Sequence, residues 1–191
     1  MLYKEILGLI TVILAMGSYV PYIKNALFGK TRPHAFSWLI WTILTGVGFF
    51  IQTANGAGPG AWFNGVMTVV CAILTVIGFV KGRKEIISYD WISFILAFVA
   101  IYLWLVEKDP TISIAFVIVA DALGMVPTVR KSFVHPYSET METYAINAFR
   151  VFLAIFALDK FTFVTASYHV YMICANMLLV AILVLRRKKI T

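Results

Sequence analysis

The sequence predicts an all-α integral membrane protein with seven transmembrane helices, and three observations lead to this fold class. Of the 191 residues, 61% are hydrophobic and 13% are charged, about half of the charged share in a soluble domain. The mean hydropathy is +0.90. Apolar segments of about 20 residues, long enough to cross a bilayer, recur along the whole chain. They leave only short loops and tails, which excludes an extramembrane enzyme domain and a disulfide framework.

Clusters of Gly, Pro and charged residues separate the apolar segments, as is typical of the loops between membrane spans. These clusters lie at 29–33, 55–60, 81–85, 107–110, 135–136 and 159–160. The predicted spans are 6–27, 35–53, 61–80, 90–106, 111–132, 142–158 and 165–185.

The distribution of Lys and Arg predicts the orientation in the membrane. Twelve of the 16 cations, Lys131 among them, follow the first, third, fifth and seventh spans, and three lie on the opposite side. The positive-inside rule then places the amino terminus outside and the carboxyl terminus in the cytoplasm, most simply in a plasma or inner membrane. This rule accounts for the net charge of +7, so nucleic acid is not an expected partner.

A shift of 106 residues aligns the end of the first span with the end of the fifth. The order apolar, proline, basic, hydroxyl, aromatic then repeats, which indicates a duplicated helix bundle. Three helices end on the side opposite to their start, so one additional helix is needed to keep the second copy parallel. The matched pairs are Val20 and Val126, Pro21 and Pro127, Lys24 and Arg130, Ser37 and Thr143, and Trp38 and Tyr144.

The predicted plan is therefore 3+1+3, with two parallel three-helix bundles joined by a linker helix. The first bundle comprises residues 1–85, the linker 86–108, and the second bundle with its basic cytoplasmic tail 109–191. With these features the chain resembles the SWEET sugar transporters and the wider PQ-loop (MtN3-like) superfamily over essentially its whole length. The motif positions read Val20-Pro21-Tyr22 and Val126-Pro127-Thr128.

The resemblance implies a transporter that moves a small polar solute, a sugar or similar, by alternating access between the two bundles. It also implies a substrate-binding asparagine in the seventh helix, where Asn176 matches in depth, and another in the third. There the nearest candidates are Asn64, toward the outer end, and Cys71, at the central depth. Two alternatives remain open: a PnuC-like vitamin transporter, and a seven-helix receptor or sorting protein of the PQ-loop type.

Charged and polar residues lie near the centre of the second bundle. Asp121 and Arg150 are about ten residues into their spans, a depth at which charges face the bundle interior and pair. One interpretation is a structural ion pair between them. In the other, Arg150 binds the solute, and Asp121 is its partner or a proton carrier. Helical spacing adds Tyr144 and Asn147 to the face of Arg150.

Three further features of the sequence each admit a structural and a functional interpretation. Asn64, Thr68, Cys71 and Thr75 form a polar stripe that either packs helices together or lines a pathway. Trp38 and Trp41 either anchor the second span at the membrane interface or stack on a sugar ring. Pro21 and Pro127 act either as hinges for alternating access or as static kinks.

Catalytic and cofactor motifs are missing from the predicted spans, so neither an enzyme nor a cofactor is expected. Cys71 and Cys174 show no metal-ligand spacing, and no metal site is predicted. The expected partners are the lipid bilayer and the small polar solute. Protons join them if the carrier is coupled, and a second copy of the chain does so if the protein forms a homo-oligomer.

Overall fold

The computed structural model describes residues 2–54, 62–82, 85–107, 109–156 and 162–190. Throughout these residues the fold is all-helical, with seven α-helices, one short 3-10 turn and no strand. The helices are α1 (Leu2–Leu27), α2 (Ala35–Ala54), α3 (Trp62–Lys81), α4 (Ser88–Val106), α5 (Pro110–Val134), α6 (Met141–Ile155) and α7 (Phe163–Ile190), and the turn is η3 (Pro136–Ser138).

Local sequence signals explain where several of these helices begin and end. Asp109 caps α5, because its carboxylate accepts hydrogen bonds from the amides of Thr111 (2.7 Å) and Ile112 (3.1 Å). After α1, the chain turns through Gly29, whose φ of +74° favours glycine. The seventh helix continues beyond the predicted end at 185, since the basic tail is part of it.

Three helical stretches are long and apolar enough to cross a membrane: Tyr3–Leu27, Ser88–Val106 and Ala166–Lys189. Ala35–Gly46 and Gly65–Lys81 are shorter apolar stretches. The protein therefore has the character of a helical membrane protein.

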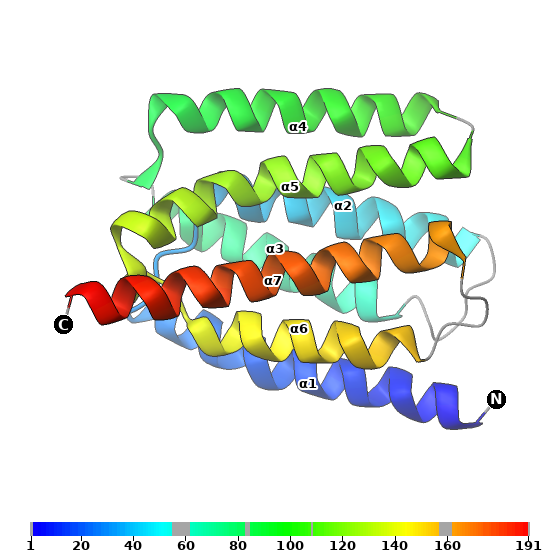
Figure 1. Ribbon diagram of the computed structural model, residues 1–191, viewed down its shortest axis with the longest axis horizontal. Coiled ribbons are helices and arrows are strands. Elements are labelled where there is room, and N and C mark those ends of the chain that lie inside the picture. The colour runs from blue at the N-terminus through cyan, green and yellow to red at the C-terminus, as the bar shows by residue number, and fades with distance from the viewer. Residues whose placement is uncertain (1, 55–61, 83–84, 108, 157–161, 191) are drawn as a thin grey trace.

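The helices lie side by side along the long axis of the molecule, with the two termini at opposite ends (Figure 1). Within the first part of the chain, α3 packs against both α2 and α1. Within the last part, α7 packs against both α6 and α5. The two groups meet where α1 contacts α6 and where α2 contacts α5, and α4 packs mainly on α5.

The start of α4 is attached to the rest of the molecule by an ionic network. Asp90 is 1% exposed and accepts hydrogen bonds from Arg130 Nε (3.0 Å) and Nη2 (2.9 Å). Its Oδ2 also lies 3.1 Å from Nε2 of the buried His34. Asp90 thus connects α4 to α5 and to the residue that precedes α2.

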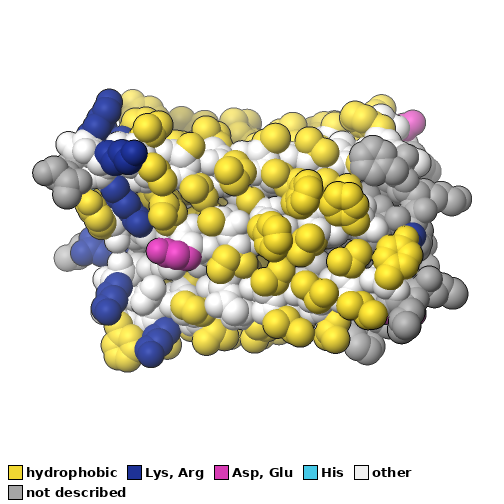
Figure 2. Space-filling model, turned by 60° about the horizontal axis from the view of Figure 1, so that its bottom comes forward, with side chains coloured by type: hydrophobic (Ala, Val, Ile, Leu, Met, Phe, Trp, Pro, Cys, Tyr) yellow, Lys and Arg dark blue, Asp and Glu magenta, His cyan; other side chains and the backbone are white. Residues whose placement is uncertain are grey.

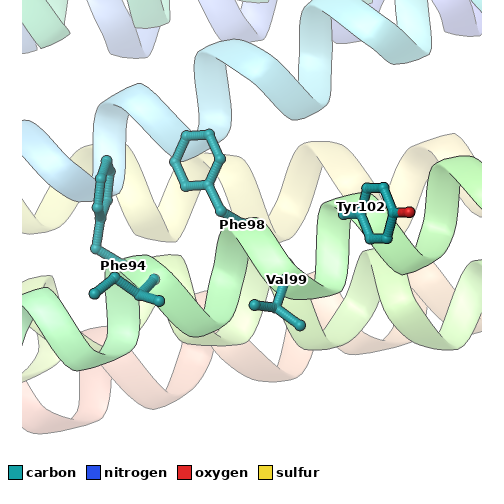
Figure 3. A pocket seen from close by; sticks show the side chains of 5 residues that line it. Phe94, Phe98, Val99 and Tyr102 are labelled. Carbon is teal, nitrogen blue, oxygen red and sulfur yellow. The ribbon is translucent and has the colours of Figure 1, made fainter.

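The outer surfaces are apolar, and charge is concentrated at one end. Figure 2 shows Lys and Arg side chains gathered at the end that holds the carboxyl terminus, with hydrophobic side chains along the rest of this face. On α4, five apolar or aromatic residues line an open hollow, shown in Figure 3. They are Phe94, Ile95, Phe98, Val99 and Tyr102.

The prediction that Trp38 anchors α2 at the membrane interface is wrong. Trp38 is 2% exposed, and its ring centroid lies 5.3 Å from that of Tyr22, 6.1 Å from that of Tyr19 and 5.0 Å from that of Trp41. These aromatic rings belong to the core between α1 and α2. Trp38 is buried because Tyr19 and Tyr22 of α1 pack against its ring.

Candidate functional site

Two buried polar clusters lie among the helices, and they are built from different residues. The first is the central polar cluster, on α5, α6 and α7. Its members are Asp121, Asn147, Arg150, Tyr168, Tyr171 and Asn176. The second is the basic-end cluster, near the end of the molecule that carries the cations. Its members are Tyr22, Lys131, Glu139 and Tyr144.

A chain of amide hydrogen bonds forms one half of the central polar cluster. Arg150 donates to Asn147 Oδ1 from Nε (3.1 Å) and from Nη2 (2.7 Å). Asn147 in turn donates to Asn176 Oδ1 at 3.1 Å, and Asn176 donates to the carbonyl of Met172 at 2.7 Å. Three of the predicted site residues are therefore in direct contact. All three are buried, as their depth in the spans predicts.

Asp121 forms the other half of this cluster with two tyrosines of α7. Tyr168 donates to Asp121 Oδ1 at 3.1 Å, and Tyr171 donates to Oδ2 at 2.8 Å. Asp121 and Arg150 do not form an ion pair with each other. The structural interpretation predicted a direct salt bridge between Asp121 and Arg150, and this prediction is wrong. Both halves include residues of α7, since Asp121 bonds Tyr168 and Tyr171 and Asn147 bonds Asn176.

The basic-end cluster places a carboxylate between the two groups of helices. The side chains of Lys131 and Glu139 are fully buried and form an ion pair. Glu139 Oε2 accepts hydrogen bonds from Tyr22 of α1 (2.7 Å) and from Tyr144 of α6 (3.0 Å). Lys131 also donates to the carbonyl of Arg32. Lys131 is thus a buried, paired charge and not the loop cation that the sequence predicts.

Two hydrogen bonds between the two groups of helices involve positions that the sequence offset pairs. Thr128 of α5 donates to the hydroxyl of Ser37 on α2 at 2.9 Å, and Thr143 of α6 donates to the carbonyl of Ser18 on α1 at 3.1 Å. Ser37 and Thr143 are equivalent under the shift of 106 residues. Each therefore bonds the first helix of the opposite group.

The remaining predicted residues lie outside both sets of hydrogen bonds. Trp41 is half-buried and packs on Trp38, and Cys71 is 2% exposed in the core. The side chain of Asn64 lies outside the described residues. Thr68 and Thr75 bond Thr45 (3.3 Å) and Thr42 (3.1 Å) of α2, in agreement with a packing role for the polar stripe.

The two prolines that the sequence predicts as hinges both lie inside continuous helices. Pro21 is exposed within α1, and Pro127 is buried within α5. A proline inside a helix cannot donate the hydrogen bond to the carbonyl four residues earlier. Both positions are thus weak points of otherwise regular helices, near the level of the basic-end cluster.

Sequence reasoning missed five residues of these clusters as site residues: Tyr22, Lys131, Glu139, Tyr168 and Tyr171. The spacing of the two tyrosines, three residues apart and within two turns of Asn176, is the signal that could have indicated them. Lys131 and Glu139 had no such signal, because charges beside a loop are usually solvated.

No group of three or more His, Cys, Asp or Glu residues that could hold a metal ion occurs within the described residues.

Comparisons with known proteins give no family assignment. No protein-family model matches the chain, and no curated protein or solved structure matches it either.

Proposed function

We propose that the protein is a carrier that moves a small polar solute across a membrane by alternating access. In this proposal all seven helices span the bilayer. The helices α1–α3 form one bundle and α5–α7 the other, and α4 is the linker that keeps the two parallel. This is the 3+1+3 plan of the SWEET and PQ-loop proteins that the sequence resembles.

The observation that carries the proposal is the reciprocal pair of contacts made by Ser37 and Thr143. Ser37 accepts from Thr128 of α5, and Thr143 donates to Ser18 of α1, so both matched positions lie at contacts with the opposite group, as an internal repeat would predict. The packing order supports this, since α3 contacts both of its neighbours and α7 does likewise. Repeats of this kind in transporters place the solute between the two halves.

The two polar clusters fit the two requirements of such a carrier. The basic-end cluster closes the interface between the bundles at one end through Tyr22, Glu139 and Lys131. The central polar cluster offers amide, guanidinium and carboxylate groups at the midplane, suited to hydrogen-bond a polar solute. Rocking of the bundles about Pro21 and Pro127 would open the closed end.

The orientation is part of the proposal. With the basic end in the cytoplasm, the amino terminus lies outside and the carboxyl terminus inside. The structure as described would then be closed toward the cytoplasm.

Flux measurements in proteoliposomes test the proposal. A panel of sugars, amino acids and vitamins is offered with and without a proton gradient, and Asn176→Ala and Arg150→Ala are compared with the parent chain. We expect saturable uptake that falls at least about tenfold in both variants, the effect of about 1.4 kcal/mol.

Exposed neighbours on the same helices provide the controls. Met177→Ala and Phe149→Ala alter side chains that are 51% and 55% exposed, so they should leave the flux unchanged. Absence of flux for every solute, from protein that is folded and inserted, contradicts the carrier and favours a receptor or sorting protein.

A further inference from the structure

Asp121 is a buried carboxylate whose hydrogen-bond partners are uncharged. It is 2% exposed, and its two oxygens accept from Tyr168 and Tyr171. Among the described residues, no Lys, Arg or His nitrogen lies within ion-pair distance of it. A carboxylate at this depth is costly without a positive partner, so the site is suited to a cation that comes from outside the chain.

The groups around Asp121 favour an organic ammonium over a metal ion. The rings of Tyr168 and Tyr171 lie 6.0 Å apart with an interplanar angle of 32°, and both hydroxyls bond the same carboxylate. Each tyrosine hydroxyl that donates to Asp121 keeps lone pairs that can accept from an N–H group. Aromatic faces next to a carboxylate attract ammonium groups, whereas Mg²⁺ or Ca²⁺ requires a larger set of oxygen ligands.

The neighbouring groups define the other end of such a ligand. Arg150 lies on α6, which packs against α7, the helix that carries Tyr168 and Tyr171. Beyond the guanidinium lie the amides of Asn147 and Asn176. Guanidinium and amide groups bind carboxylates and hydroxyls. An amine held at Asp121 would therefore direct an acidic or hydroxylated end toward Arg150.

An open hollow on α7 leads to one of the two tyrosines. It has a volume of about 530 Å³, and Tyr171 is one of its lining residues together with Ser167, which precedes Tyr168. The hollow begins at Thr162 and Phe163, near the start of α7 and therefore away from the basic end. Tyr171 thus bonds the carboxylate of Asp121 and also lines this hollow on the surface of α7.

We propose that Asp121, Tyr168 and Tyr171 form a binding site for the ammonium group of a small primary amine, whose other end carries a carboxylate or hydroxyl. This inference rests on the proposed function, since it names the class of solute that the carrier takes. It differs from a neutral sugar site in requiring one positive charge on the solute.

Two matched pairs of probes test the ammonium site: glucosamine against glucose, and L-alanine against L-lactate. In each pair an ammonium group replaces one hydroxyl, and little else changes. Uptake is measured in proteoliposomes at a slightly acidic pH, and binding is measured in detergent by the shift in Tm. We expect the amine of at least one pair to be preferred about tenfold or more, a preference that Asp121→Asn abolishes.

Two variants keep the test sharp. Asp109→Asn makes the same chemical change at the exposed start of α5, where asparagine also caps a helix, and should leave the preference intact. Tyr171→Phe removes one hydroxyl while keeping the ring, and should weaken the preference even if Asp121→Asn fails to fold.

The outcomes separate the solute class from the transport function. Saturable uptake of the hydroxyl members that is equal to that of the amines and indifferent to Asp121→Asn overturns the ammonium site but leaves the carrier. A Tm increase from the amines without any flux supports the site and contradicts the carrier. If no amine gives either flux or a Tm shift, the ammonium site is overturned.

Discussion

Lys131 and Glu139 show how much can depend on a single buried charge in this molecule. Their side chains are fully buried and paired, so replacing Glu139 by Gln leaves the ammonium of Lys131 without its anion. Breaking a buried pair in this way costs about 3–5 kcal/mol. We therefore expect Glu139→Gln to lower the Tm in detergent markedly, although Gln can still accept from Tyr22 and Tyr144.

Two comparisons isolate the charge effect at this position. Glu142→Gln makes the same change at an exposed position in the first turn of α6, and should leave the Tm nearly unchanged. The double variant Lys131→Met/Glu139→Gln removes both charges and should recover part of the loss. Equal Tm values for Glu139→Gln and Glu142→Gln would show that the ion pair contributes nothing measurable.

The sequence indicated some residues of the two clusters and not others. Asn147, Arg150 and Asn176 could be predicted, because a polar side chain deep in an apolar segment must face other protein. Tyr168 and Tyr171 were missed despite their helical spacing, since tyrosine is common at both ends of membrane spans. The hydrogen bond between Tyr22 and Glu139 joins residues 117 positions apart. No local sequence pattern contains such a contact.

Individual helices were the easiest features to predict. Each of the seven predicted spans corresponds to a helix, because hydropathy and the Gly, Pro and charge clusters mark helix ends locally. The packing between helices depends instead on small residues whose role appears only in three dimensions. A Cβ added at Gly78 would lie 2.9 Å from Cα and 3.0 Å from the amide nitrogen of Ala35, both backbone atoms.

Gly78 therefore allows the end of α3 to approach the start of α2. We expect Gly78→Ala to destabilise the protein by about 1–3 kcal/mol, the usual cost of inserting a methyl group into a closely packed contact. The measurement is the Tm in detergent. Gly17→Ala in α1 is the control, since a Cβ at this position would have no neighbouring atom within 4 Å. Alanine also favours the helix over glycine by about 1 kcal/mol. A Tm for Gly78→Ala at or above that of Gly17→Ala contradicts the close contact.

For the whole molecule, the repeat in the sequence stays a prediction, and two of its matched positions, Ser37 and Thr143, lie at contacts between the two groups of helices. The matched positions differ where the second group carries charge. The positions equivalent to Asp121 and Arg150 are Ala15 and Leu44, both buried and apolar. The two groups thus differ in polarity at these equivalent positions. The burial of Glu139 and Lys131 could not be predicted, because it depends on contacts that form only in the folded molecule.

The closed basic end gives a prediction about the motion of the whole molecule. Ser37 is fully buried beside Thr128 at the contact between α2 and α5, so a thiol placed there should react only when the two groups of helices separate. In a chain with Cys71→Ala and Cys174→Ser, we expect Ser37→Cys to be labelled slowly by a membrane-impermeant maleimide from the basic side. Glu139→Gln should raise that rate about tenfold, because each 1.4 kcal/mol removed from the closed state shifts its equilibrium by that factor.

Lys188→Cys, at an exposed position of the basic tail, is the control for access of the reagent to that side. Its labelling should be fast with and without Glu139→Gln. A Ser37→Cys thiol that stays unreactive with and without Glu139→Gln, while Lys188→Cys reacts, would mean that the two groups of helices do not separate at this end. The clusters would then stabilise a static bundle, and a receptor would explain the molecule better than a carrier. Reaction that depends on Glu139 instead identifies the buried carboxylate as the group that holds the closed state, because within the described residues Ser37 bonds Thr128 and not Glu139.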